Sequence, residues 1–274
     1  MEYLRHVRPI RPPAAYIGGK RQLAKTLVPM IEAIPHTTYA EPFLGMGGIF
    51  FRRQRVPRAE VVNDFSRDVT TLFRILQRHY PQFMDELRFG ITSRAEFQRL
   101  LAADPSTLTD LERAARFLYL QRTVFGGKVN GKTFGVSPLD PGRFDVTKLA
   151  PLLDAIHDRL AGVVIECLSY VDFIPRYDRP EVLFYLDPPY WGCERDYGPD
   201  TFSRDDFERL AGLLRGLKGK FILSLNDTEP VRRIFEGFEI LPVGLTYTIT
   251  RGKAVEAREV IISNVPLIQA HQAA

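Results

Sequence analysis

The stretch Val182-Leu183-Phe184-Tyr185-Leu186-Asp187-Pro188-Pro189-Tyr190 is a short apolar run that ends abruptly in an acid, two prolines and an aromatic residue. Five consecutive apolar residues, 182–186, predict a buried strand of the kind found in parallel sheets. Ligands of such sheets bind at the carboxyl ends of the strands, so we expect Asp187 to face a site. Asp and Pro are also common turn residues, and a plain turn is the alternative interpretation.

The length and composition fit one large globular domain, or one domain that carries an insertion. The chain has 274 residues, of which 45% are hydrophobic and 26% are charged. It contains no transmembrane run, and the basic, Pro-rich segment 1–13 has no signal-peptide core. The two cysteines lack disulfide or metal-ligand spacing, so we expect a cytoplasmic protein without a metal site. Cys167 lies in an apolar run, and we expect it to be buried.

The net charge of +4 and the pI of about 9.1 are compatible with nucleic-acid binding but do not establish it. Basic residues gather near the start of the chain, in its middle and near its end. These groups are Arg5, His6, Arg8 and Arg11; Arg122, Lys128, Lys132 and Arg143; and Arg251, Lys253 and Arg258. Scattered solvated charge explains any one group equally well.

Two glycine-containing loops in the first 64 residues indicate a nucleotide-like cofactor. Tyr16-Ile17-Gly18-Gly19-Lys20 precedes a helical pattern over 22–34, where free backbone amides can hold an acidic ligand group. In this loop, Lys20 is suited to bind a carboxylate, although a solvated lysine beside a turn is the simpler interpretation. The strand predicted over 38–40 leads into the glycine-rich stretch 41–48 and an apolar helix start at 49–51.

A second strand, 60–63, ends in Asp64, which lies 17 residues after Gly47. An acid at about this distance holds the ribose diol in nucleotide-binding folds of this arrangement. The loop and the acid together favour a cofactor that contains ribose.

From Ser66 to about Pro151 the sequence shows successive amphipathic helical patterns, too long for one crossover between parallel strands. We predict an inserted helical subdomain. It ends in the stretch 121–135, where basic, aromatic and glycine residues alternate. This pattern suits a hairpin that enters a nucleic-acid groove, and a mobile surface loop is the alternative.

The sheet pattern then resumes with a helix over 146–160 and a strand over 163–168. Asp172 and Phe173 follow on a predicted loop, an acid and a ring suited to adenine, although Asp172 also fits a helix cap. A helix from Ser203 to Leu217, a strand over 221–225 and a short helix come after the opening strand. The segments 239–249 and 259–264 predict an antiparallel pair that closes the sheet.

Five motifs in this order resemble the Dam-type class of S-adenosylmethionine-dependent adenine-N6 DNA methyltransferases. They are Tyr16-Ile17-Gly18-Gly19-Lys20, Glu41-Pro42-Phe43-x-Gly45-x-Gly47-Gly48, Asn63-Asp64, Asp172-Phe173 and Asp187-Pro188-Pro189-Tyr190. The terminal stretch 259–264 is also similar to the closing strand of that family. The match runs from Tyr16 to about Asn264, nearly the whole chain.

The resemblance implies an α/β, Rossmann-like methyltransferase sheet, mostly parallel with an antiparallel hairpin at its C-terminal end. The catalytic and cofactor-binding domain would comprise residues 1–67 and 151–274, and the helical target-recognition insert residues 68–150, with a basic hairpin at 121–137. S-adenosylmethionine would be bound by Tyr16, Gly18, Gly19, Lys20, Glu41, Pro42, Phe43, Gly45, Gly47, Asp64, Asp172, Phe173 and Asp187, with Asp64 on the ribose.

The resemblance makes Asp187, Pro188, Pro189 and Tyr190 the catalytic residues. The amino nitrogen of adenine is a poor nucleophile, because its lone pair is delocalised into the ring. Asp187 and the carbonyl of Pro188 can each accept one of its N–H groups, which favours a pyramidal nitrogen aimed at the methyl group. The prolines fix the backbone and remove N–H donors. Tyr190 can stack on the base once it leaves the duplex.

The expected partner is double-stranded DNA, contacted by Arg122, Lys128, Asn130 and Lys132, and a cognate restriction endonuclease is a further candidate. The hairpin departs from the family pattern at Gln121 and Gly126, so recognition of GATC does not follow. Two alternatives stay open: an amino-methyltransferase acting on RNA or cytosine N4, and a non-catalytic DNA-binding protein with a methyltransferase-like fold. Asp187 favours adenine over cytosine.

Overall fold

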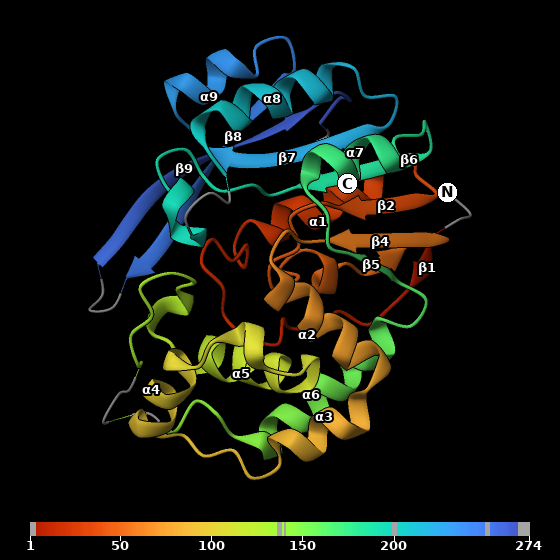
Figure 1. Ribbon diagram of the computed structural model, residues 1–274. Coiled ribbons are helices and arrows are strands. Elements are labelled where there is room, and N and C mark those ends of the chain that lie inside the picture. Colours follow the sequence, from red (N-terminus) through yellow and green to blue (C-terminus); the bar gives the residue numbers. More distant parts are fainter. Residues whose placement is uncertain (1–3, 136–138, 140, 199–201, 250–252, 268–274) are drawn as a thin grey trace.

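The computed structural model describes residues 4–135, 139, 141–198, 202–249 and 253–267. Its centre is a sheet with the strand order β5-β4-β2-β6-β7-β9-β8 (Figure 1). The strands are β2 (Thr38–Glu41), β4 (Ala59–Asn63), β5 (Val164–Glu166), β6 (Val182–Leu186), β7 (Lys220–Asn226), β8 (Glu239–Ile249) and β9 (Lys253–Ser263). β5, β4, β2, β6 and β7 are parallel, whereas β9 runs antiparallel to both β7 and β8. The predicted mostly parallel sheet with a closing antiparallel hairpin is confirmed.

The apolar run 182–186 forms the central strand β6, and all five of its residues are buried. Tyr185 and Leu183 face one hydrophobic cluster, while Val182, Phe184 and Leu186 face another. Because successive side chains of a strand point to opposite faces, a strand covered on both sides must be apolar throughout. Each large apolar side chain buried this way contributes roughly 1.5–3 kcal/mol. β6 is therefore firmly anchored up to the residue before Asp187.

The chain changes direction across the sheet between β2 and β6, which are hydrogen-bonded neighbours. From β2 it proceeds outward to β4 and β5, and from β6 it proceeds the opposite way to β7. Crevices for ligands form at such a switch point, outside the carboxyl ends of the strands. Glu41 ends β2 and Asp187 follows β6, so both acids lie at this crevice.

Helices cover both faces of the sheet, and a further group of helices extends it at one end (Figure 1). One cluster contains α1 (Ala24–Ala33), and the opposite cluster contains α7 (Tyr170–Tyr177), α8 (Arg204–Arg215) and α9 (Glu229–Ile234). Between β4 and β5 lie α2 (Arg67–Arg78), α3 (Tyr80–Leu87), α4 (Arg94–Ala102), α5 (Asp110–Thr123) and α6 (Val146–Arg159). Residues of these helices share one continuous core with α1 and the sheet. The division at residues 68 and 150 stays a prediction.

Three local expectations were wrong. The predicted helix start at 49–51 is only a short 3-10 helix, η1 (Phe50–Arg52), because β3 (Arg55–Val56) soon pairs with β1 (Arg5–His6). Cys167 is exposed, since it follows the edge strand β5. Asp172 and Phe173 lie in the first turns of α7 and not on a loop.

Candidate active site

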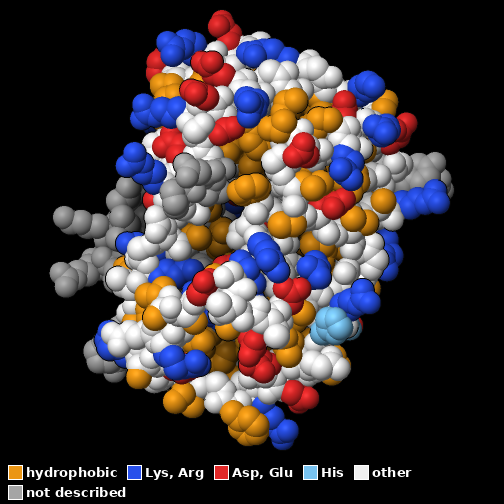
Figure 2. Space-filling model, viewed as in Figure 1, with side chains coloured by type: hydrophobic (Ala, Val, Ile, Leu, Met, Phe, Trp, Pro, Cys, Tyr) orange, Lys and Arg blue, Asp and Glu red, His pale blue; other side chains and the backbone are white. Residues whose placement is uncertain are grey.

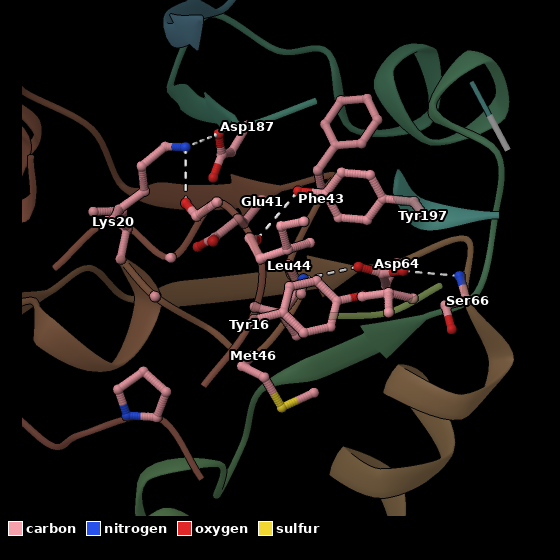
Figure 3. A pocket seen from close by; sticks show the side chains of 18 of the residues that line it. Tyr16, Lys20, Glu41, Phe43, Leu44, Met46, Asp64, Ser66, Asp187 and Tyr197 are labelled. Carbon is pink, nitrogen blue, oxygen red and sulfur yellow. Dashed lines mark hydrogen bonds and ion pairs between the residues drawn. The ribbon is translucent and has the colours of Figure 1, made fainter. Parts of the chain in front are cut away.

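A cavity of about 1140 Å³ opens at the carboxyl edge of the sheet, beside the switch point between β2 and β6. Figure 3 shows that Lys20, Glu41, Asp64 and Asp187, although far apart in the sequence, converge on it. Of the residues expected to bind the cofactor, most line the cavity. These are Tyr16, Gly18, Gly19, Lys20, Glu41, Pro42, Phe43, Gly45, Asp64, Asp172 and Asp187; Gly47 and Phe173 do not line it. Of the predicted catalytic residues, Asp187 and Pro189 line it, and Pro188 and Tyr190 lie directly next to them in the chain.

Asp187 is held by Lys20, whose side chain is only 3% exposed. The Lys20 ammonium lies 2.7 Å from Asp187 Oδ1 and donates to the Gly18 carbonyl at 3.1 Å (Figure 3). It also lies 4.3 Å from the centre of the Tyr190 ring. Burial raises the pKa of Asp187, while the Lys20 charge and a hydrogen bond from Ser224 oppose that rise. The lysine therefore favours the ionised, accepting form of Asp187.

Glu41 forms a second carboxyl group on the cavity wall and is 1% exposed. Its Oε2 accepts a hydrogen bond of 2.7 Å from the Tyr39 hydroxyl. Burial raises the pKa of Glu41 from 4.5 to about 8, and this hydrogen bond and the charge of Arg53 only partly offset the effect. Without a nearby ligand, Glu41 is thus largely protonated at neutral pH.

Asp64 is fixed by two backbone amides. Gly45 donates to Oδ2 and Ser66 donates to Oδ1, each at 2.8 Å (Figure 3). Burial raises the pKa of Asp64 to about 6, against the effect of these two bonds. Gly45 has φ +52°, and a Cβ atom there would lie 3.0 Å from the Tyr16 ring, so this position requires glycine. The glycine-rich loop and Asp64, the acid expected to hold the ribose, are therefore joined by a hydrogen bond.

Neighbouring Asn63 joins three loops of this edge. Its Nδ2 donates to the carbonyls of Pro42 and Leu168 at 2.9 and 3.0 Å. Its Oδ1 accepts from the Leu168 amide at 2.8 Å. The loops after β2, β4 and β5 are held together by this one buried amide.

Phe173 does not provide the ring that the sequence suggested for adenine. Its side chain is completely buried in the core beneath α7, while Asp172 lines the cavity and accepts a bond of 2.6 Å from the helix-capping Ser169 hydroxyl. A side chain one position further along a helix points about 100° away, which takes the ring into the core. Phe65, which lines the cavity and is 59% exposed, was missed. Its place directly after Asp64 was the available signal.

The predicted hairpin begins later than expected, because Gln121 and Arg122 belong to α5. Val124 bridges to Phe134, so the two arms of a hairpin are present, and residues 136 and 137 lie outside the described part of the chain. Gln121 is buried, and its Nε2 donates to the carbonyls of Ala15 and Gly127 at 2.9 and 2.7 Å. The Gly127 carbonyl also accepts from the Ile17 amide at 3.0 Å. The base of the hairpin is therefore bonded to the Tyr16–Lys20 loop.

The four predicted DNA contacts differ in how free their side chains are. Arg122 lines the cavity and donates to the carbonyls of Pro13 and Arg143 at 2.9 and 3.2 Å. The Lys132 ammonium lies 5.8 Å from the centre of the Phe117 ring and is partly buried. Lys128 and Asn130 are exposed, and Asn130 donates to the Arg195 carbonyl at 3.3 Å. The bonds of Arg122 join the end of α5 to Pro13 and Arg143.

On the face seen in Figure 2, charge alone does not mark a DNA-binding surface. Figure 2 shows Lys and Arg side chains interspersed with acidic ones over the visible face. Within the described residues, no His, Cys, Asp or Glu side chains group in threes suited to a metal ion, and no helix is long and apolar enough to cross a bilayer.

Comparison with known proteins identifies a family whose model matches this chain. The model of the family described as "D12 class N6 adenine-specific DNA methyltransferase" matches residues 16–249. The type II methyltransferase M1.LlaDCHI of Lactococcus lactis subsp. cremoris is 28% identical, over 93% of this chain and 95% of its own. The type II methyltransferase M.CviBI of Paramecium bursaria Chlorella virus NC1A is 22% identical, over 84% and 88%. A DNA adenine methylase of Vibrio cholerae is also 22% identical, over 87% and 90%.

Proposed function

Since the chain belongs to the D12 class of N6 adenine-specific DNA methyltransferases, we propose that methyl transfer takes place at Asp187, in the cavity at the carboxyl edge of the sheet. The activity is site-specific methylation of adenine in DNA, with S-adenosylmethionine as the methyl donor. The observation that carries the assignment of the site is the ion pair between Lys20 and Asp187 at the end of β6. This ion pair supports Asp187 as an oriented acceptor on the wall of the cavity.

The residues around the cavity fit the donor. S-adenosylmethionine has a ribose diol, an adenine ring and two positive groups, the sulfonium and the ammonium. Asp64, with one amide on each oxygen, has lone pairs left to accept from a diol. Phe65 offers an exposed ring next to it. Glu41 and Asp187 supply acidic groups for the cationic part. When bound there, the donor supplies an electrophilic methyl group.

Asp187 and Pro188 act on the adenine. Ionised Asp187 accepts one N–H of the amino group, and the Pro188 carbonyl accepts the other, which frees the nitrogen lone pair for attack. Pro188 and Pro189 are buried, so the acceptors are held in place before reaction. After methylation the nitrogen loses one proton, and the Asp187 carboxylate is the acceptor in contact with it. Alignment of this kind supplies on the order of 7–11 kcal/mol in favourable cases.

The adenine must leave the duplex to reach Asp187, because an amino group stacked inside DNA cannot enter a cavity. We assign target recognition to the insert 68–150 and to its hairpin, in which Val124 bridges to Phe134. Lys128 and Asn130 support this assignment, since their side chains are exposed and Val129 between them lines the cavity. Arg122 and Lys132 as DNA contacts stay predictions, as do a cognate restriction endonuclease and a cytoplasmic location.

The test is incubation of the protein with methyl-labelled S-adenosylmethionine and mixed-sequence duplex DNA, with single-stranded RNA in parallel. We expect label in duplex DNA, recovered as N6-methyladenine after digestion, and sequencing of modified positions then gives the target site. Label in cytosine or only in RNA would replace adenine as the substrate. No transfer to any substrate would support the non-catalytic alternative.

A further inference from the structure

Strand β7 lies next to β6, and its register brings two polar side chains beside the catalytic segment. Leu186 pairs with Leu223, so Asp187 follows on one strand where Ser224 follows on the other. Side chains two residues apart on a strand share a face. Ser224 and Asn226 therefore lie on one face of β7, and both are hydrogen-bonded to the segment 187–191, although nothing in the family motifs singles them out.

Ser224 is completely buried and donates to Asp187 Oδ1 at 3.2 Å. The Tyr185 hydroxyl lies 3.0 Å from Ser224 Oγ. Because the single hydroxyl hydrogen of Ser224 goes to Asp187, Tyr185 must be the donor in this pair. The result is a relay of oriented hydroxyls that runs from Tyr185 to Ser224 to Asp187.

Lys20 approaches the same carboxylate oxygen, Oδ1, at 2.7 Å. A lysine ammonium sits on a flexible stem and does not by itself fix the plane of a carboxylate. A second donor on the same oxygen, fixed on a neighbouring strand, sets that plane. Both donors use Oδ1, so Oδ2 is the oxygen that they leave to accept from adenine.

Asn226 holds the other end of the segment. Its Oδ1 accepts from the Trp191 amide and its Nδ2 donates to the Trp191 carbonyl, both at 2.9 Å. This pair of bonds imitates one more step of strand pairing just after Tyr190. The four residues that carry the chemistry are thus fixed at both ends by one strand.

We propose that Ser224 and Asn226 are positioning residues for methyl transfer: β7 fixes the carboxylate plane of Asp187 and the path of the chain through Tyr190. The inference rests on the proposed function and adds residues that do not touch the substrate. A merely structural role would cost stability alone. A positioning role costs turnover at full occupancy of both ligands.

The first test is Ser224→Ala, measured as the single-turnover methylation rate with saturating cofactor and DNA. We expect the rate to fall about ten- to hundredfold, while the cofactor dissociation constant changes less than about threefold. Ser263→Ala is the matched control. Ser263 is an equally buried serine at the far end of the same sheet, where it donates to the Phe221 carbonyl at 2.6 Å. It should lower the melting temperature without slowing transfer.

Tyr185→Phe tests the relay without deleting Ser224. We expect a smaller loss of rate, about threefold. The double variant Tyr185→Phe/Ser224→Ala should be no slower than Ser224→Ala alone, since both changes act through one bond. Additive losses would overturn the relay. Ser224→Ala should also shift the acid limb of the pH–rate profile to higher pH, because the hydrogen bond from Ser224 lowers the pKa of Asp187. A purely structural serine would leave that limb in place.

Asn226→Ala should slow transfer about tenfold. The rate of Asn226→Asp should lie between that of Asn226→Ala and that of the wild type, because Asp keeps the acceptor for the Trp191 amide but not the donor to its carbonyl. The outcomes separate the two levels of argument. If the wild type transfers no methyl group, the proposed function fails. If the wild type is active while Ser224→Ala and Asn226→Ala keep its full rate, only the positioning role fails.

Discussion

The segment 187–191 and the hairpin 124–135, to which we have assigned parts in one reaction, are built in opposite ways. The first follows a completely buried strand and is bonded to Lys20, Ser224 and Asn226. The second is anchored through buried Gln121 and exposes Phe125, Lys128 and Asn130. Chemistry needs acceptors that do not move, whereas reading DNA needs side chains that remain available. Changes in the first region should therefore affect rate, and changes in the second should affect DNA affinity.

The largest effect is expected for Asp187→Ala. Loss of the acceptor should reduce single-turnover transfer by a thousandfold or more, on the order seen when an oriented polar group is removed from an active site. Circular dichroism should show a folded protein with a lower melting temperature, because Lys20 loses its partner. Near-normal turnover would contradict the proposed mechanism and the contrast between the segment 187–191 and the hairpin.

Lys20→Ala should weaken cofactor binding and, because Lys20 also pairs with Asp187, slow transfer. We expect the dissociation constant for the cofactor to rise about ten- to hundredfold, because a charge-assisted contact is lost. The affinity for DNA should change less than about threefold. Titration of each ligand separately measures both, and Lys25→Ala, an exposed lysine on α1, is the control. A loss confined to DNA affinity contradicts this placement of Lys20.

Lys128→Ala should weaken DNA binding by a few-fold up to about tenfold, reduce the slope of log affinity against log salt by about 1, and leave the saturated transfer rate unchanged. Lys132→Ala, within the same hairpin, should have less effect because that ammonium lies against Phe117. Fluorescence anisotropy at several salt concentrations supplies both quantities. A slower saturated rate with normal affinity would make the hairpin part of the chemistry.

The smallest effect concerns stability and pH. The pKa of Glu41 is raised from 4.5 to about 8 in the folded chain, so the folded state holds a proton that the unfolded state has lost. The free energy of unfolding of the ligand-free protein should therefore fall as pH rises between these values. Glu41→Gln should flatten that dependence in urea titrations at pH 5 and pH 8. An unchanged dependence would mean that Glu41 is ionised throughout.

Sequence alone identified the sheet and its acids, because each depends on local pattern. Asp187 follows a run that only a buried strand explains, and Asp64 lies at the spacing expected after a glycine loop. The rings were harder to assign. Phe65 and Phe173 each follow an acid, yet one faces the cavity and the other the core, because one lies on a loop and the other in a helix.

Contacts across strands were beyond the sequence for a different reason. Ser224 and Asn226 act on Asp187 and Trp191 only because of the register between β6 and β7, and no spacing within one segment encodes that register. The end of α5 was also uncertain. Gln121 looked like part of a DNA-reading hairpin, but helical hydrogen bonding continues to Thr123 and turns its amide inward.

The carbonyl of Gly127 in the hairpin accepts from both Ile17 and Gln121. The Tyr16–Lys20 loop of the cavity is therefore hydrogen-bonded to the hairpin through this one oxygen. Neither can shift without straining a bond of the other. Thermodynamic linkage then requires reciprocity: if DNA on the hairpin changes affinity for the methyl donor by some factor, the donor changes affinity for DNA by the same factor. A measurement of donor affinity with and without DNA thus reports on the hairpin without any change to the hairpin itself.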